Sequence, residues 1–292
     1  MIEKCALCGK EKELRKSHIA PKFFSNYIKN NFLSNRMRES SKVNTPVQDG
    51  VKKKLLCSEC EELFSEYETY FSKEYFNKVK IIFPNKKIDK DLEIISEYIK
   101  RAFLPQIKCT KELYNFVLSI FWRYIIADKE NIYKKLYSEE KDEMEVFLKL
   151  TEEHFLIDEK FEELSKYKLH IIENKHLLNF AISPYQKEFI HMLFGQIGFY
   201  SCVYPNDEIK FNYLRYTLVV PYFTFVLEII PNEENVIFRN TEIKLEKEVM
   251  GDKVILPKDL ITNIVCCFQK ERNAGIEALS EKQKENILQR MK

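Results

Sequence analysis

CALC at Cys5–Cys8 and CSEC at Cys57–Cys60 are the two stretches of this sequence that decide its fold. Each is a C-x-x-C pair, and forty-eight residues lie between the two pairs. A pair with this spacing can hold two thiolates about 2.3 Å from one tetrahedral Zn²⁺. The sequence therefore predicts a structural zinc site, with Cys5, Cys8, Cys57 and Cys60 as ligands, that folds the first sixty residues into a small domain.

Composition excludes several other classes of protein. With only 6 Gly, the chain contains neither a G-x-G-x-x-G nor a P-loop motif, so a nucleotide-binding Rossmann or P-loop fold has no support. Its longest apolar run, near residues 217–230, is too short for a membrane span, and no apolar leader opens the chain. We therefore expect a soluble, cytoplasmic protein without a membrane partner. In that compartment C-x-x-C pairs indicate metal or redox sites rather than disulfides.

Charge is distributed unevenly along the chain. Residues 1–60 contain 13 Lys and Arg against 6 Asp and Glu, whereas residues 61–292 contain 34 against 39. A small basic region attached to an acidic body indicates a polyanion as the partner of the basic region. The alternative is a lysine-rich face that is simply solvated.

The first eighty residues are expected to be strands and turns followed by a long helix. Apolar spacing and turn residues predict these elements in order: short strands within 1–8 and 9–19, a loop over 22–50 with a short helix at Phe23–Phe32, a strand at 51–56, and a helix from Ser58 to about Val79.

A second region, 81–292, begins with helices capped by Thr110 and Ser138. On the first of these helices we expect Trp122 in the core and Arg123 pointing outward.

The sequence pattern of the remainder of the chain is typical of a β-rich domain. Alternating and continuous apolar runs predict six strands: 169–172, 177–182, 199–203, 214–220, 223–230 and 236–238. Further helices are predicted after Ser183, after Pro257 and after Ser280. The fold class is therefore α+β, with an N-terminal zinc domain (1–80), a helical middle segment and a C-terminal mixed domain with an antiparallel sheet (81–292).

Three short motifs give the N-terminal region a family resemblance. The order of strand, knuckle, strand, loop, strand and knuckle-on-helix is that of a zinc treble clef. The motifs are Cys5-x-x-Cys8, then Ser17-His18-Ile19-x-Pro21, then Leu55-Leu56-Cys57-x-x-Cys60-Glu61. Over residues 3–72 the chain resembles the HNH (His-Me finger, ββα-metal) endonucleases, and residues 81–292 resemble no family that we recognise.

The resemblance implies a nuclease chemistry for two residues. It assigns His18 as the base that activates water, and Glu61 as a ligand of a catalytic Mg²⁺ or Mn²⁺ ion. The chain departs from the family pattern at Ser17, where an acidic metal ligand is expected. It departs again at Lys52, near the position of an asparagine that orients the histidine; Asn44 or Asp49 in the preceding loop could replace that asparagine.

The expected function is a metal-dependent nuclease with DNA as partner, of the kind used in restriction or anti-phage defence. The cations expected to contact phosphates are Arg15, Lys16, Lys22, Arg36, Arg38, Lys52, Lys53 and Lys54. The C-terminal region could bind a partner subunit or a second copy of the chain. Two other interpretations stay open: a catalytically silent zinc module that binds nucleic acid or protein, and a protein adaptor that binds no nucleic acid.

Overall fold

The computed structural model of the chain describes residues 2–31, 37–38, 46–47, 49–79, 107–157, 159–174, 197–204, 213–230, 242–244, 248–249, 277, 280–282 and 285. The helices are α1 (Lys22–Asn31), α2 (Ser58–Phe71), α3 (Asn77–Val79), α5 (Lys111–Ala127), α6 (Lys129–Tyr133), α7 (Ser138–Leu156) and α8 (Phe161–Leu164). The strands are β1 (Ile2–Lys4), β2 (Glu11–Glu13), β3 (Arg15–His18), β4 (Met37–Arg38), β5 (Pro46–Val47), β6 (Lys52–Leu56), β7 (Ile107–Lys108), β8 (Lys168–Glu173), β9 (Gly198–Tyr204), β10 (Tyr213–Val220), β11 (Phe223–Ile230) and β12 (Glu248–Val249). Helices and antiparallel strands are mixed, which confirms the α+β class.

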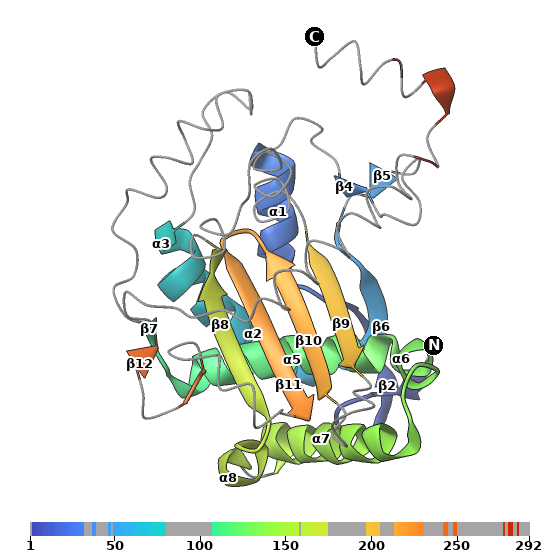
Figure 1. Ribbon diagram of the computed structural model, residues 1–292, viewed down its shortest axis with the longest axis vertical. Helices are drawn as coiled ribbons and strands as arrows, with labels where there is room; N and C mark the ends of the chain where they lie inside the picture. Colours follow the sequence, from blue (N-terminus) through green and yellow to red (C-terminus); the bar gives the residue numbers. More distant parts are fainter. Residues whose placement is uncertain are drawn as a thin grey trace.

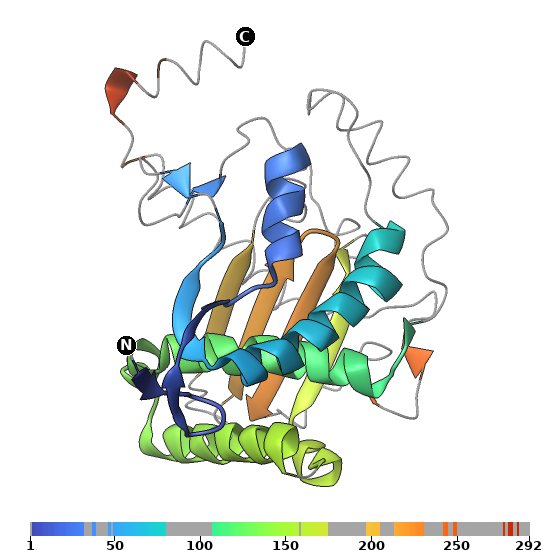
Figure 2. The same ribbon diagram turned by 180° about the vertical axis from the view of Figure 1, so that it is seen from behind.

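Antiparallel strand pairs and two helices build the N-terminal region. β1 pairs with β2, β3 pairs with β6, and β4 pairs with β5. α1 lies in the connection between β3 and β6, close to the short helix expected at Phe23–Phe32. The chain then passes from β6 directly into α2, so the antiparallel pair β3–β6 leads into one long helix (Figure 2).

α2 continues through a π-helical turn (η2, Ser72–Phe76) into α3, so the helix predicted from Ser58 to Val79 is present. The π-helical turn adds a residue to one turn, and its last two residues, Tyr75 and Phe76, are both buried. The inner face of α2 is aromatic. Phe71 stacks on Phe116 of α5 with ring centroids 4.1 Å apart.

α5 is the central helix of the structure. The Thr110 hydroxyl accepts a hydrogen bond from the Leu113 backbone N–H, as expected for its N-cap. Nearly every side chain of α5 is buried, because the helix lies between α2 and the large sheet. Trp122 is buried, as predicted, but the outward orientation predicted for Arg123 is wrong: the Arg123 side chain is 1% exposed.

The large sheet has the strand order β8-β11-β10-β9, with every neighbouring pair antiparallel. α5 crosses one face of this sheet and α7 lies across one end of the strands (Figure 1). Phe223 and Phe225 point from β11 toward the helices, and both rings contact Phe71. The strands predicted at 214–220 and 223–230 therefore contribute to the core where their side chains are described.

A tight hairpin between β10 and β11 is closed by Pro221 and Tyr222. Tyr222 has a φ of 72°, a left-handed conformation that is uncommon for a bulky residue. Asn174 braces the turn, because its side-chain N–H donates to the Val220 carbonyl and its backbone N–H donates to the Tyr222 carbonyl. The Tyr222 and Tyr27 hydroxyls are 2.5 Å apart, so this hairpin contacts α1 of the N-terminal region.

One helix start differs from the prediction, and other predictions cannot be compared. The N-cap of α7 is Tyr137, not Ser138, and the Glu140 side chain accepts a hydrogen bond from the Tyr137 backbone N–H. Several predictions lie outside the described residues. They are the strands at 177–182 and 236–238, the helices after Ser183 and Pro257, the domain boundary at 80/81 and most of the helix after Ser280.

None of the described helices is long and apolar enough to cross a membrane.

A buried ion pair lies on the face of the sheet opposite Phe223 and Phe225. Arg215 of β10 donates from Nε (3.1 Å) and Nη2 (3.0 Å) to Glu228 Oε1 on β11. His170 of β8 lies on the other side of the carboxylate, with Nε2 3.4 Å from Glu228 Oε2. Burial raises the pKa of Glu228, but His170 and Arg215 outweigh it, so the pKa is lowered.

The aromatic stack between α2 and α5 gives the first prediction. Phe71→Ala should lower the free energy of unfolding by about 3–5 kcal/mol, because it leaves a cavity against Phe116, Phe223 and Phe225. Urea unfolding followed by far-UV circular dichroism measures this. Ile157→Ala is the control, since that side chain is 82% exposed and its loss should change stability by less than about 0.5 kcal/mol. Equal stability of the two variants would contradict the packing described.

The buried ion pair gives the second prediction. Glu228→Gln should lower the free energy of unfolding by about 3–5 kcal/mol at pH 7, because the buried guanidinium of Arg215 would lose the charged carboxylate that accepts two of its hydrogen bonds. The pKa of Glu228 is lowered in the folded state, so its contribution is present above the unfolded pKa and is lost as pH falls through the folded value. The difference between wild type and variant should therefore shrink in acid. Glu74→Gln, which breaks the exposed pair with Lys78, should change stability by less than about 1 kcal/mol.

Candidate metal centre and the neighbouring histidine

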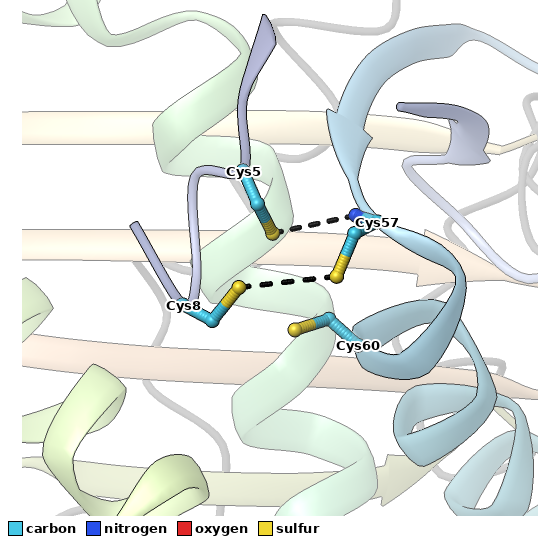
Figure 3. A group of neighbouring side chains, drawn as sticks. All are labelled: Cys5, Cys8, Cys57 and Cys60. Atoms are coloured by element: carbon cyan, nitrogen blue, oxygen red, sulfur yellow. Dashed lines mark hydrogen bonds between the residues drawn. The ribbon is translucent and has the colours of Figure 1, made fainter. Parts of the chain in front are cut away.

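The four predicted cysteines form one cluster. The Sγ atoms of Cys5, Cys8, Cys57 and Cys60 all lie within 4.8 Å of one another. They converge on a common point between the β1–β2 connection and the start of α2 (Figure 3). Cys5, Cys57 and Cys60 are buried and Cys8 is partly exposed, so the cluster is closed on most sides.

The distances suit a tetrahedral metal ion. Two thiolates about 2.3 Å from a tetrahedral zinc lie about 3.8 Å apart, and the Sγ atoms of Cys8 and Cys57 are separated by 3.8 Å. The Cys57 backbone N–H also donates to Cys5 Sγ at 3.3 Å, a contact that orients the sulfur. Four sulfur ligands with this geometry could hold a structural Zn²⁺, which would complete the cluster without an open position.

The pKa values of the buried thiols shift in different directions. Burial raises the pKa of Cys5, but backbone hydrogen bonds around Cys8, Cys57 and Leu7 outweigh it and lower the pKa to about 7. Burial also raises the pKa values of Cys57 and Cys60, with no such reversal. Four thiolates at this spacing repel one another, so the fully ionised set requires a divalent cation.

Local backbone structure explains how the chain forms the two knuckles. Gly9 has a φ of 68°, and its N–H donates to the Cys5 carbonyl, which closes the first knuckle turn. The Ala6 N–H donates to the Leu55 carbonyl, so this knuckle is attached to β6. Cys57 is the N-cap residue of α2, where the helix dipole favours a negative sulfur.

Ser17 and Glu61, both singled out in the sequence, contact each other. The buried Ser17 hydroxyl on β3 donates to Glu61 Oε2 on the first turn of α2, at 2.5 Å. Glu61 directly follows Cys60 and is partly exposed. The cysteine cluster and this hydrogen bond together hold the start of α2 against β3.

His18 ends β3, and its imidazole is partly buried. Burial is the main reason that its pKa is lowered to about 4, and the positive charges of Lys52 and Lys22 act in the same direction, against Asp49. Nε2 is buried and has no hydrogen-bond partner within the part of the chain that the structure describes. Successive strand side chains alternate, so His18 leaves β3 on the face opposite to Ser17.

A residue that the sequence did not indicate holds the backbone of His18. Arg123 Nη1 donates to the His18 carbonyl at 2.9 Å and lies 2.7 Å from Glu68 Oε1 of α2. In the sequence Arg123 follows Trp122 in an aromatic helix, and nothing in that pattern reveals its partners.

Three of the predicted phosphate-contacting cations share the face of His18. In the register of β3 and β6, Lys16 lies opposite Lys54, and His18 lies opposite Lys52. Lys54 pairs with Glu3 at 3.0 Å and Lys52 with Asp49 at 2.7 Å. The face around His18 therefore carries a row of lysines, two of which have acidic partners.

The other predicted site residues are dispersed or lie outside the description. Arg15, Lys22 and Lys53 are exposed. Hydrogen bonds from Lys52 and Lys29 hold the pKa of Asp49 well below its usual range. Arg36, Asn44 and the side chain of Arg38 lie outside the described residues.

Comparisons with known proteins add no family to this description. No model of a known protein family matches the chain, and searches of curated proteins and of solved structures found no match. The resemblance to the HNH endonucleases therefore rests on the residues of this chain alone.

The cysteine cluster gives the third prediction. The purified protein should contain about one zinc per chain, and Cys57→Ser should lose most of it, because three thiolates and a hydroxyl bind zinc less tightly. Mass spectrometry of the metal content measures this. Cys109→Ser is the control, since Cys109 is buried outside the cluster and its loss should leave the zinc in place. Zinc-free wild-type protein that is fully folded would contradict the assignment.

Proposed function

We propose that the chain is a metal-dependent endonuclease of the HNH type, which hydrolyses phosphodiester bonds of nucleic acid through His18 and Glu61. The observation that carries the proposal is the hydrogen bond from Ser17 to Glu61. It joins the residue before His18 to the residue after Cys60, so the strand that carries the candidate base adjoins the helix that carries the candidate metal ligand, with the His18 side chain on the other face of that strand. The strand pair β3–β6, followed by α2 with the cysteine cluster at its start, supports the finer fold, a zinc treble clef of ββα-metal type.

His18 has the protonation state that a general base requires. A base must be unprotonated at the working pH and must come within hydrogen-bonding reach of the water that it activates. With its pKa lowered to about 4, mainly by burial, the imidazole is neutral at pH 7. In this proposal Nε2, which has no partner among the described residues, accepts the proton of the attacking water.

Glu61 would hold the catalytic Mg²⁺ or Mn²⁺ ion. Its partly exposed carboxylate has a second oxygen beyond the one that accepts the Ser17 hydrogen bond. Mg²⁺ is commonly bound by one or two carboxylates, with waters and substrate phosphates as the other ligands. Such an ion, when bound, stabilises the negative charge that develops on the phosphate. Ser17 orients the carboxylate without adding a second charge.

The lysine row fits a nucleic acid as the substrate, and we propose DNA. Lys16, Lys52 and Lys54 lie on the His18 face of the strand pair β3–β6, where a phosphate backbone could follow them. The acidic C-terminal region would bind a partner subunit or a second copy of the chain. An enzyme built in this way suits cytoplasmic restriction or anti-phage defence; these last assignments rest on the residue pattern and the resemblance.

A second function is favoured by a specific observation. The Nε2 atom of His18 is buried, and a serine stands where the resemblance leads one to expect an acidic ligand. In this second candidate the zinc unit is catalytically silent and binds nucleic acid through the lysine row. The two candidates share the zinc site and the partner, and they differ only in whether the bound strand is cut.

The fourth prediction separates these two candidates. Wild-type protein should nick supercoiled plasmid in the presence of Mg²⁺ or Mn²⁺, and His18→Ala should lower the rate about 10²–10⁴-fold, the usual contribution of a general base. Gel electrophoresis of the plasmid over time measures the rate, and zinc content and unfolding show that the variant is intact. Glu61→Gln should also lower the rate, with a higher metal concentration needed for half-maximal cleavage.

Three outcomes bear on the proposal. If wild type cuts neither DNA nor RNA with either metal but binds DNA with a steep salt dependence, the silent module is supported. Cleavage that survives His18→Ala would contradict the mechanism while leaving the activity. Absence of both cleavage and salt-dependent binding would support the adaptor interpretation, in which no nucleic acid is bound.

A further inference from the structure

Arg123 is a buried cation that links α5 to α2 and to the end of β3. Its side chain is 1% exposed and extends from α5. Nη1 donates to the His18 carbonyl at 2.9 Å and lies 2.7 Å from Glu68 Oε1, while Nε donates weakly to the Ser119 carbonyl at 3.4 Å. The guanidinium also lies over the Phe64 ring, 5.4 Å from its centroid.

A buried arginine is costly unless its geometry supplies strong partners. Removing a guanidinium from water costs several kcal/mol, which a carboxylate, a carbonyl and an aromatic face can offset. Glu68 balances the charge and belongs to α2, whereas the neutral carbonyl belongs to His18. Since Glu68 alone could balance the charge, the bond to His18 has a separate consequence: it fixes the backbone of one particular residue.

We propose that Arg123 is the positioning residue of His18, and that α5 is thereby part of the site. This inference rests on the proposed function, in which His18 is the base. The Arg123 bond fixes the carbonyl of His18, and with it the direction in which the imidazole leaves the strand. The side chain of Lys52, the residue opposite His18, bonds Asp49. A base that is misplaced by about 1 Å can cost about 10²-fold in rate.

Arg123→Met and Arg123→Lys test this positioning in the full chain. The methionine removes every donor, so kcat for plasmid cleavage should fall about 10²-fold with KM unchanged. The lysine keeps the charge but loses the planar fork, so it should fold with its zinc and recover part of kcat. Recovery by lysine shows that the donor and its charge matter rather than the volume of the side chain.

Glu68→Gln is the matched control. The amide oxygen can still accept from Arg123, and the bond to the His18 carbonyl remains. Loss of the negative charge opposite the buried guanidinium should lower the free energy of unfolding, but kcat of the folded variant should stay within about 3-fold of wild type. If Glu68→Gln lowers kcat as much as Arg123→Met does, Arg123 acts by fastening α2 to α5 and the positioning proposal is wrong. Wild-type kcat in a folded Arg123→Met would also overturn it.

A second measurement does not depend on cleavage. Histidine-selective ¹⁵N labelling gives ring resonances for the 5 His of the chain, and the signals that His18→Gln removes belong to His18. The His18 ring signals should shift in Arg123→Lys and Arg123→Met, but much less in Glu68→Gln. Shifted His18 signals in a protein that cuts no substrate would support the positioning by Arg123 and contradict the proposed function. Unchanged His18 signals in both Arg123 variants would overturn the positioning, whatever the activity.

Discussion

The clustering of four cysteine sulfurs is the interaction on which the N-terminal region depends. It joins residues 5–8 to residues 57–60, which are separated by forty-eight residues. Closing such a long loop costs conformational entropy. The free energy of zinc binding can contribute directly to folding, beside the burial of side chains such as Phe24 and Leu56. The register of β3 with β6 and the contact of Ser17 with Glu61 follow from this closure, because both lie between the knuckles or directly beside them.

Helix α2 connects the cysteine cluster to the rest of the protein. α2 begins at the cysteine cluster and ends at Phe71, whose ring lies against α5 and against β11. Because α2 is packed against both, the aromatic core and the cysteine cluster hold each other in place. Arg123 adds polar contacts at the last turn of α2, where Glu68 of α2 and the end of β3 meet α5. His18 is therefore held from both its own strand pair and the helical layer behind it.

Local patterns in the sequence predicted the parts of the structure that local physics controls. Ligand spacing indicated the cysteine cluster, and the Thr110 cap with helical apolar spacing predicted α5. Arg123 was mistaken for an outward residue because the sequence cannot show that a carbonyl about a hundred positions earlier needs a donor. The cap of α7 was shifted by one residue because the Glu140 carboxylate accepts from the Tyr137 N–H, a bond that does not require Ser138 as cap. Such long-range and backbone contacts determine the surroundings of His18, and sequence patterns do not report them.

The serine at position 17 has a physical reason that the pattern alone does not reveal. Ser17 is fully buried and its oxygen lies 2.5 Å from Glu61. A carboxylate in its place would meet a second carboxylate at contact distance, and such a pair repels unless a cation lies between them or one of them is protonated. The hydroxyl instead donates a hydrogen bond, so β3 and α2 are held together whether or not a cation is bound. In the proposed nuclease this arrangement lowers the intrinsic affinity for the metal, and in exchange the carboxylate is oriented before the metal and the substrate phosphate arrive.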